Sequence, residues 1–196
     1  MRRDSKHPIT HQAWDAIRNH GAIVALLVVV CAFAAFGIRS PNEPSDLTIH
    51  FSPNGGAAEA VVREIEAAKK TMDVAAFTIT HPDISRAIIH AHQRGVNVRV
   101  VMDPTQATAR YSAATPLFNA GIPVYIERGA GLLHHKLAII DSKTVITGSM
   151  NWSRAGDEVN DEDLVIIRDE KIAKIYAEHF NTLIKNADGR KAIQCQ

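Results

Sequence analysis

The pattern of apolar and polar positions predicts strands and helices that alternate along most of the chain. Runs that are alternately or continuously apolar are typical of strands, and they occupy residues 47–51, 72–78, 96–102, 122–126, 133–140, 144–148 and 163–167. Apolar residues at helical spacing occupy residues 57–70, 81–94, the stretch just before Gly121 and residues 171–184. This order predicts an α/β fold with a mixed, mostly parallel β-sheet and helices on both faces.

The N-terminal part of the chain has a different pattern, an uncharged apolar run over residues 21–38 that is expected to form a helix. Its length matches the ~18 residues at which a helix can span a membrane. Basic residues precede the run, whereas an acidic, proline-bearing stretch follows it after Arg39. This asymmetry predicts that the N-terminus stays in the cytoplasm and that the rest is exported. The expected location is therefore periplasmic or exported, with an anchor in the inner membrane if the helix is retained.

Two interpretations of this apolar run remain open. A retained signal anchor fits its length, whereas a cleaved signal peptide fits the A-x-A-like sequence at residues 32–34. In either case, residues 1–38 are expected to be the targeting segment and residues 39–46 a linker. Residues 47–187 are expected to form the folded domain, and residues 188–196 a C-terminal tail.

Composition excludes several classes of site and partner. The chain has 196 residues, of which 46% are hydrophobic and 22% charged, so it can bury a core and is not a disordered polymer. Its net charge is +1, so nucleic-acid binding would need a local basic groove rather than bulk positive charge. The two cysteines, Cys31 and Cys195, match no zinc spacing. The sequence also has no cluster of carboxylates that would suggest a two-metal site. Neither a metal nor a cofactor is therefore expected.

The residues with the clearest chemical content lie on the last predicted hairpin. Strand alternation places His134 and Lys136 on one face. A hairpin loop centred on residues 142–143 would pair Lys136 with Ser149 and would bring His134 opposite to Asn151. An imidazole, an ammonium, a hydroxyl and an amide would then converge on one patch. Such a patch suits a phosphate diester, because three of these groups can bind its oxygens and the imidazole can act as a nucleophile or move a proton.

The spacing of these residues resembles the HKD motif of the phospholipase D superfamily. The pattern H-x-K-x4-D-x6-G-S-x-N is met by His134, Lys136, Asp141, Gly148, Ser149 and Asn151. The resemblance covers most of residues 47–187 and is closest to small bacterial, metal-independent periplasmic endonucleases with a single HKD motif. Its matching stretches are FSPNGGA, AAFTITHPDISRAI, RGVNVRVVMD and NAGIPV. It implies a phospholipase D-like catalytic domain, in which Gly148 would let the backbone approach a ligand closely.

The resemblance implies a two-step mechanism that proceeds through a phosphohistidine. One histidine would attack phosphorus, a second would protonate the leaving oxygen, and water would hydrolyse the intermediate. The mechanism requires two HKD motifs, but only His134 is followed two positions later by a lysine. The second copy would therefore come from another subunit, which predicts a two-fold symmetric homodimer with a composite active site.

The resemblance also implies roles for individual residues. The residues expected to be catalytic are His134, Lys136, Ser149, Asn151 and Glu162. Among these, Glu162 would orient the catalytic imidazole. Supporting roles would fall to Asp141, Gly148 and Asn160. Trp152 directly follows the motif and could contact a base, but packing in the core or at the rim of the site is the favoured interpretation.

Three functions fit the sequence. The leading prediction is a metal-independent endonuclease with little sequence preference that acts on DNA, with RNA as a second candidate substrate. The alternative is a phospholipase D that hydrolyses phospholipid head groups, which an anchor at residues 21–38 would hold near its substrate. The motif does not separate the two, because both substrates contain a phosphodiester. A non-catalytic phosphate-binding module is a minor alternative, which the complete motif disfavours.

Overall fold

A seven-stranded sheet forms the centre of the structure, a computed structural model that describes residues 46–187. The strands are β1 (Asp46–Ser52), β2 (Thr71–Ala76), β3 (Asn97–Met102), β4 (Val124–Ile126), β5 (Lys136–Ile140), β6 (Thr144–Gly148) and β7 (Glu162–Arg168). The helices are α2 (Ala57–Ala67), α3 (Pro82–Gln93), α4 (Pro104–Ala107), α5 (Ala114–Asn119), α6 (Arg154–Glu158) and α7 (Glu170–Asn186). The predicted targeting segment, nearly all of the linker and the C-terminal tail lie outside the described residues. None of the described helices is long and apolar enough to cross a membrane.

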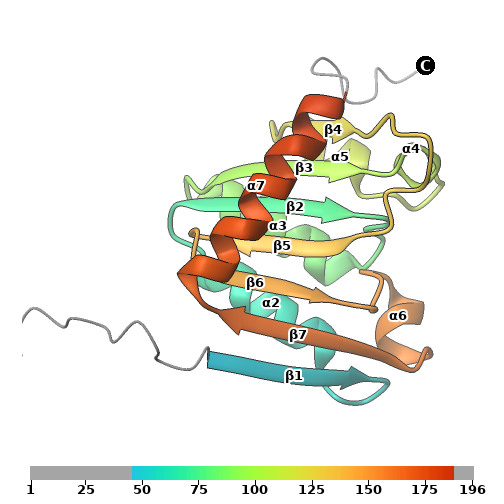
Figure 1. Ribbon diagram of the computed structural model, residues 1–196. Helices are drawn as coiled ribbons and strands as arrows, with labels where there is room; N and C mark the ends of the chain where they lie inside the picture. The colour runs from blue at the N-terminus through green and yellow to red at the C-terminus, as the bar shows by residue number, and fades with distance from the viewer. Residues whose placement is uncertain (1–45, 188–196) are drawn as a thin grey trace, which may run out of the picture. The chain divides into compact units, whose positions relative to one another are not determined.

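The strand order is β1-β7-β6-β5-β2-β3-β4 (Figure 1). β2 pairs with β3, and β3 with β4, in parallel, whereas the other four neighbouring pairs are antiparallel. The mixed α/β sheet is thus confirmed, but the expectation of mostly parallel pairing is wrong. The cause is the position of β5, which lies beside β2 in the opposite direction. The β5–β6 hairpin, β7 and β1 then extend the sheet as antiparallel neighbours.

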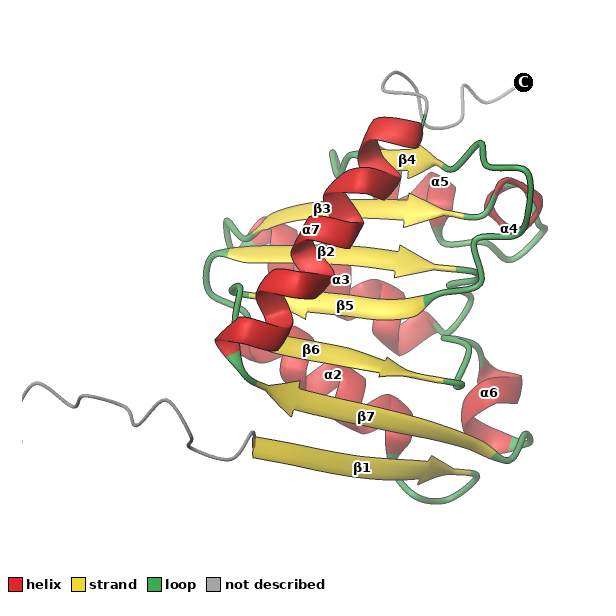
Figure 2. Ribbon diagram, in the orientation of Figure 1, coloured by secondary structure: helices red, strands yellow, loops and turns green. Residues whose placement is uncertain are grey.

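Helices cover both faces of the sheet, as predicted (Figure 2). α2, α3 and α5 lie on one face, whereas α7 is the one described helix that crosses the other face. Val74 and Ala138 belong to the larger core, which lies under α2 and α3. Their neighbours Ala75 and Leu137 belong to the smaller core under α7. Because side chains alternate along a strand, Lys136 faces the same side of the sheet as Ala138.

The first described helix ends earlier than predicted. The expected helix over residues 57–70 stops at Ala67, because Ala68 adopts an extended conformation with a ψ of 136°. The three N–H groups that follow donate to the carboxylate of Asp141. A side chain distant in the sequence thus satisfies the backbone donors that a longer helix would have paired internally. This contact joins the turn before β2 to the turn between β5 and β6.

Candidate active site

The predicted catalytic residues gather at one end of the sheet, where β5 begins, β6 ends and β7 begins (Figure 1). His134 lies just before β5, and Lys136 is the first residue of that strand. Ser149 directly follows β6, and Glu162 is the first residue of β7. Asn151 lies between β6 and α6. Since β6 runs antiparallel to both neighbours, these positions meet at the same end of the sheet, and together they form a patch, the cradle.

Lys136 is buried and contacts the more exposed His134. Its Nζ lies 3.2 Å from His134 Nδ1 and donates to the His134 carbonyl oxygen at 3.0 Å. Because Nδ1 faces the ammonium, Nε2 is the ring nitrogen left to contact a substrate. Nε2 is a nucleophile in the tautomer that carries its proton on Nδ1, in which the ammonium donates to the carbonyl oxygen alone. Burial lowers the pKa of Lys136, and the nearby Glu162 carboxylate offsets part of that effect.

Phe77, which the sequence pattern does not single out, packs against both residues. The centroid of its ring lies 4.8 Å from that of the His134 imidazole and 5.3 Å from Lys136 Nζ. Its N–H donates to the carbonyl of His135 at 2.7 Å, directly after β2. The ring therefore forms an apolar wall of the cradle and adds a cation–π contact to the lysine. In the sequence, an aromatic residue at the end of a buried strand is equally consistent with simple packing in the core. The sequence therefore contains no distinct signal that this ring contacts the motif residues.

Two side chains hold the carboxylate of Glu162. Ser149 Oγ donates to Oε2 at 2.5 Å, and Asn160 Nδ2 donates to Oε1 at 3.0 Å. Ser149 Oγ in turn accepts the N–H of Asp163 at 3.0 Å. The structure therefore brings Ser149, Asn160 and Glu162 together. Within the described part of the chain no hydrogen bond joins Glu162 to His134, so the orienting role expected of Glu162 stays a prediction.

The β5–β6 hairpin has a register one residue away from the predicted one. Ala138 pairs with Ile146, because the loop contains three residues rather than two. The first two loop residues have φ values of 53° and 54°, and the aspartate at the first position tolerates this left-handed conformation. The predicted cross-strand pairs between cradle residues are therefore wrong, and Lys136 does not lie directly opposite Ser149.

A bulge at Gly148 compensates for the shifted register. The N–H groups of Ser149 and Met150 both donate to the carbonyl of Asp163, at 3.1 and 3.2 Å, which is typical of an extra residue in one strand. Gly148 has a φ of +142°, and a Cβ at this position would collide with the same carbonyl. The close approach of β7 therefore requires the glycine, whereas the approach of a ligand to this backbone stays a prediction. The extra residue turns Ser149 toward Glu162.

Asn151 and Trp152 have different environments. Trp152 is 0% exposed and belongs to the larger core, so it packs as favoured and does not reach a base. Its carbonyl accepts the N–H groups of Thr80 and His81 at 2.8 and 2.9 Å. Asn151 Oδ1 is buried and has no hydrogen-bond partner among the described residues. Because buried polar atoms without partners are rare, this amide is a candidate contact for a ligand or a second chain.

Asp141 lies at the far end of β5 from Lys136. Its carboxylate accepts the N–H groups of Lys69, Lys70 and Thr71 at 2.9, 2.7 and 2.9 Å. Partial burial opposes ionisation of this carboxyl, but the hydrogen bonds from Thr71, Lys70 and Lys69 outweigh burial and hold the pKa of Asp141 below its usual value. Asp141 therefore joins two turns and lies outside the cradle.

The structure also shows where other titratable groups near the motif lie. Among the described residues, no three His, Cys, Asp or Glu side chains converge into a possible metal site. His135 Nε2 lies 3.2 Å from Nε2 of His179, a residue of α7. Burial, followed by the charges of His179, Lys136 and His134, lowers the pKa of His135. This histidine pair lies on the α7 side of the sheet, away from the larger core.

Comparison with known proteins places the chain among its relatives. Residues 61–184 match the family model described as "Cardiolipin synthase, PLD-like domain". A mitochondrial cardiolipin hydrolase from Xenopus tropicalis is 36% identical over 121 residues, which cover 62% of this chain and 58% of the relative. A phospholipase D from Rickettsia prowazekii is 34% identical over 136 residues, which cover 69% of this chain and 66% of the relative. The chain thus spans less than two thirds of the length of these relatives.

Two solved structures have the same fold. The phospholipase D family member Nuc from Salmonella typhimurium matches with a TM-score of 0.71 and 32% identity, over 74% of this chain and 97% of that chain. NucT from Helicobacter pylori matches with a TM-score of 0.70 over 74% of this chain and 98% of that chain, and at 24% identity this likeness concerns the fold alone. The family model covers most of the described residues, and the HKD side chains meet at one end of the sheet. The chain therefore belongs to the phospholipase D superfamily.

Proposed function

We propose that this chain is a phosphodiesterase, and specifically a metal-independent endonuclease that cleaves DNA with little sequence preference, with RNA as a further candidate substrate. The observation that carries the proposal is the buried ammonium of Lys136 beside the exposed imidazole of His134. A buried charge attracts a phosphate more strongly than an exposed one, because less water screens it. The adjacent imidazole can then attack the phosphate that the lysine holds.

The proposed reaction consists of two displacements at phosphorus. In the first, the unprotonated Nε2 of His134 forms a bond to phosphorus while the bond to the leaving oxygen breaks, the ring keeps its proton on Nδ1, and a second histidine donates a proton to that oxygen. In the second, the same second histidine takes a proton from water, whose oxygen attacks phosphorus and releases His134. Lys136 stabilises the charge on the non-bridging oxygens in both steps. Glu162, which Asn160 holds, accepts the Ser149 hydroxyl, so Ser149 adds a hydrogen bond to the phosphate once its single proton turns from Glu162 to a non-bridging oxygen.

The second histidine is proposed to come from a second copy of the chain. The HKD pattern occurs once in the sequence, so a two-fold axis next to the cradle would supply a second His134. Two features support this arrangement, namely the exposure of His134 and the unpartnered Oδ1 of Asn151. Mass photometry of the full-length protein in detergent, combined with an activity measurement, tests it. The expected species is an active dimer, and an active monomer would contradict the composite site.

Nucleic acid is the favoured substrate because the folded domain resembles small endonucleases with a single HKD motif over most of its length. A phospholipid is the second candidate, because two relatives are named for cardiolipin and phospholipase D activities. The apolar run of residues 21–38 motivates the further proposal that the domain is exported and acts at or beyond the inner membrane. Fractionation of cells into cytoplasm, periplasm and membranes tests this location, and a purely cytoplasmic protein would contradict it.

A single experiment separates the candidate functions. The full-length protein in detergent is given plasmid DNA, RNA or cardiolipin-containing vesicles, each with and without EDTA. DNA cleavage that EDTA does not inhibit is expected. His134→Asn should lower the rate by at least about 1,000-fold, whereas His179→Asn, a substitution of an exposed histidine on α7, serves as the matched control and should not. Lipid turnover without DNA cleavage would overturn the nuclease proposal, and inhibition by EDTA would contradict the mechanism.

A further inference from the structure

Two hollows flank α6, the helix that follows the cradle residue Asn151, and they differ in charge. The hollow on the α2 side has a volume of about 440 Å³, and its lining includes the carboxylates Glu59, Asp83, Asp157 and Glu158. The other hollow has a volume of about 660 Å³ and is lined by side chains from residues 80–85, 110–116 and 153–155. No carboxylate lines this second hollow, which contains Arg110, Arg154 and Tyr111 and is called the arginine–tyrosine groove. Arg154 also lines the α2-side hollow, where Arg63 and the four carboxylates are its neighbours.

The arginine–tyrosine groove begins next to the cradle. Thr80, in one wall, lies three positions after Phe77, whose ring contacts His134. Ser153, in the opposite wall, lies two positions after Asn151. The N–H of Thr80 donates to the carbonyl of the residue between Asn151 and Ser153 at 2.8 Å, which joins the two walls. Two or three extended residues span at most about 7–11 Å, so the groove starts where the neighbouring unit of a bound polymer would lie.

The side chains of the groove suit a nucleotide. Tyr111 is 72% exposed, and the Arg110 guanidinium lies 5.3 Å from the centroid of its ring. Among the described residues no carboxylate pairs with Arg110. Arg154 has an ion pair with Glu158 at 3.4 Å in which both side chains are more than half exposed, and such pairs are worth only about 0.3–0.5 kcal/mol. Both guanidinium groups can therefore turn to a phosphate at little cost.

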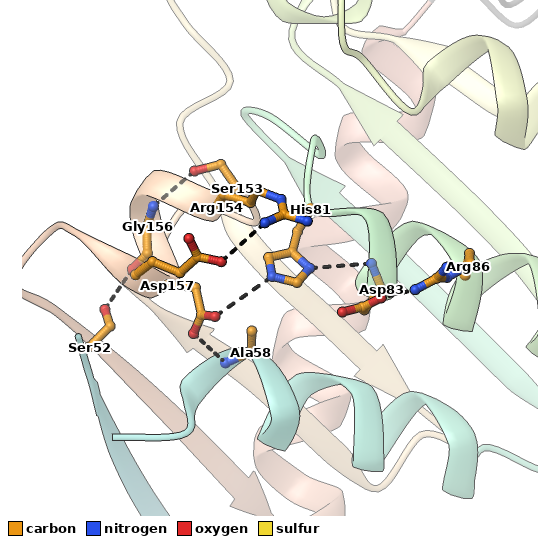
Figure 3. Close-up of polar contacts among 10 residues, drawn as sticks. Ser52, Ala58, His81, Asp83, Arg86, Ser153, Arg154, Gly156 and Asp157 are labelled. Carbon is orange, nitrogen blue, oxygen red and sulfur yellow. Dashed lines mark hydrogen bonds and ion pairs between the residues drawn. The ribbon is translucent and has the colours of Figure 1, made fainter. Parts of the chain in front are cut away.

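The wall that α6 contributes has a defined position (Figure 3). Ser52 Oγ donates to the carbonyl of Gly156 at 2.6 Å. Asp157 accepts the N–H of Ala58 at 3.2 Å and lies 3.6 Å from Nε2 of the buried His81. These contacts fix α6 to β1, α2 and the start of α3. They also leave the carboxylates on the α2 side, which disfavours a polyanion there and favours the arginine–tyrosine groove.

We propose that the arginine–tyrosine groove binds the nucleotide next to the scissile phosphate of a single-stranded nucleic acid. The base stacks on Tyr111, and Arg110 and Arg154 bind the outer phosphate, a combination of aromatic and basic contacts that suits single strands. The inference rests on the proposed phosphodiesterase activity and adds the form of the substrate. A duplex keeps its bases stacked inside and presents one to the groove only after unstacking, at a cost of about a few kcal/mol.

Fluorescence anisotropy with a labelled oligothymidylate of about 12 nucleotides tests the groove, in full-length protein carrying His134→Asn to prevent cleavage. Tyr111→Ala should weaken binding by about 5- to 100-fold, the loss of one stacked base, and Tyr111→Phe should restore it. Arg110→Gln should reduce the slope of log Kd against log salt by about 0.7, the loss of one phosphate contact. Two matched controls should leave both quantities unchanged, namely Phe118→Ala, an exposed aromatic residue, and Arg63→Gln, which lines the α2-side hollow.

Each other outcome overturns a distinct claim. If the parent protein cleaves DNA but the groove variants keep their affinity and salt slope, the groove assignment is wrong and the nuclease proposal stands. If the parent cleaves no nucleic acid, the proposed function itself fails. Equal weakening of single-stranded and duplex DNA binding in Tyr111→Ala would overturn the preference for single strands. Loss of vesicle turnover when Tyr111→Ala is made in the parent protein with His134 intact, with oligonucleotide affinity unchanged in the His134→Asn protein, would assign the groove to a lipid instead.

Discussion

The substitution Asp141→Asn removes the charge of the HKD aspartate without touching the cradle. The two carboxylate oxygens accept two N–H groups from the turn before β2 and a third from the first residue of β2, at 2.7–2.9 Å. Asparagine tolerates the left-handed φ of 53° at this position, so the turn itself is kept. The amide, however, has one acceptor oxygen instead of two, and its NH₂ group would face a backbone N–H donor.

The expected loss of stability follows from these contacts. A hydrogen bond to a charged group contributes about 1.5–3 kcal/mol, and a neutral one about 0.5–1.5 kcal/mol. The variant loses one bond and weakens two, in a carboxylate that is partly exposed. We therefore expect the free energy of unfolding to fall by about 1–3 kcal/mol. For a domain of this size, the corresponding decrease in Tm is about 3–10 °C.

The loss should depend on pH in a defined direction. The pKa of Asp141 is lower in the folded protein than its usual value, so the carboxylate stabilises the fold fully above the unfolded pKa. This contribution disappears as the pH falls through the folded pKa. The difference in stability between wild type and Asp141→Asn should therefore be largest near neutral pH and should shrink below about pH 4.

Urea unfolding, carried out near neutral pH and again below about pH 4, measures the free energy of unfolding of wild type and variant. Glu66→Gln, which removes an exposed carboxylate at the end of α2, is the control. Turnover measured where both proteins are folded should stay within about threefold of wild type, since Asp141 lies at the opposite end of β5 from Lys136. A loss of turnover of about 100-fold or more, the size expected of a group that transfers a proton, would refute the structural role.

Three further predictions concern the residues around the cradle. Gly148→Ala should lower the free energy of unfolding by about 1–3 kcal/mol, because its Cβ would collide with the Asp163 carbonyl, whereas Gly131→Ala, where a Cβ meets nothing, should not; urea unfolding compares them. Trp152→Ala should cost about 3–5 kcal/mol because the indole is fully buried, and unchanged stability with weaker DNA binding would indicate a base contact instead. Lys136→Arg should extend activity to higher pH, because burial lowers the pKa of the lysine whereas a guanidinium stays protonated; a pH–rate profile whose basic limb does not move would contradict this.

The order of elements could be predicted from the sequence, whereas the pairing of strands could not. Alternating and helical apolar patterns indicate which faces of a segment are buried, so the approximate positions of all seven strands could be predicted from the sequence. Neighbour relations depend on contacts between distant segments, and β5 lies beside β2 although two strands separate them in the chain. The early end of α2 has a similar cause, because its turn is held by Asp141, far along the sequence.

The candidate site shows the same division. Motif spacing predicted the residues that meet at the end of β5, but it could not predict the hairpin register. A three-residue loop beginning at Asp141 and a bulge at Gly148 leave no mark in the apolar pattern. Phe77 falls at the end of the predicted strand over residues 72–78, where an apolar residue indicates only burial, although β2 itself ends at Ala76. The groove residues Arg110 and Tyr111 lie in a connection, where the sequence has no periodicity to place them. Their relation to the cradle depends on the fold alone.

A bond between phosphorus and His134 is the feature on which the proposed mechanism depends most directly. Its formation can be measured by rapid mixing of the full-length protein with an oligonucleotide, denaturation in base, which preserves phosphohistidine, and mass spectrometry of the peptide that contains His134. A phosphorus-containing adduct on His134 that appears and decays during turnover, and that is absent in His134→Asn, is expected. Turnover without that adduct, or an adduct on another residue, would contradict the mechanism.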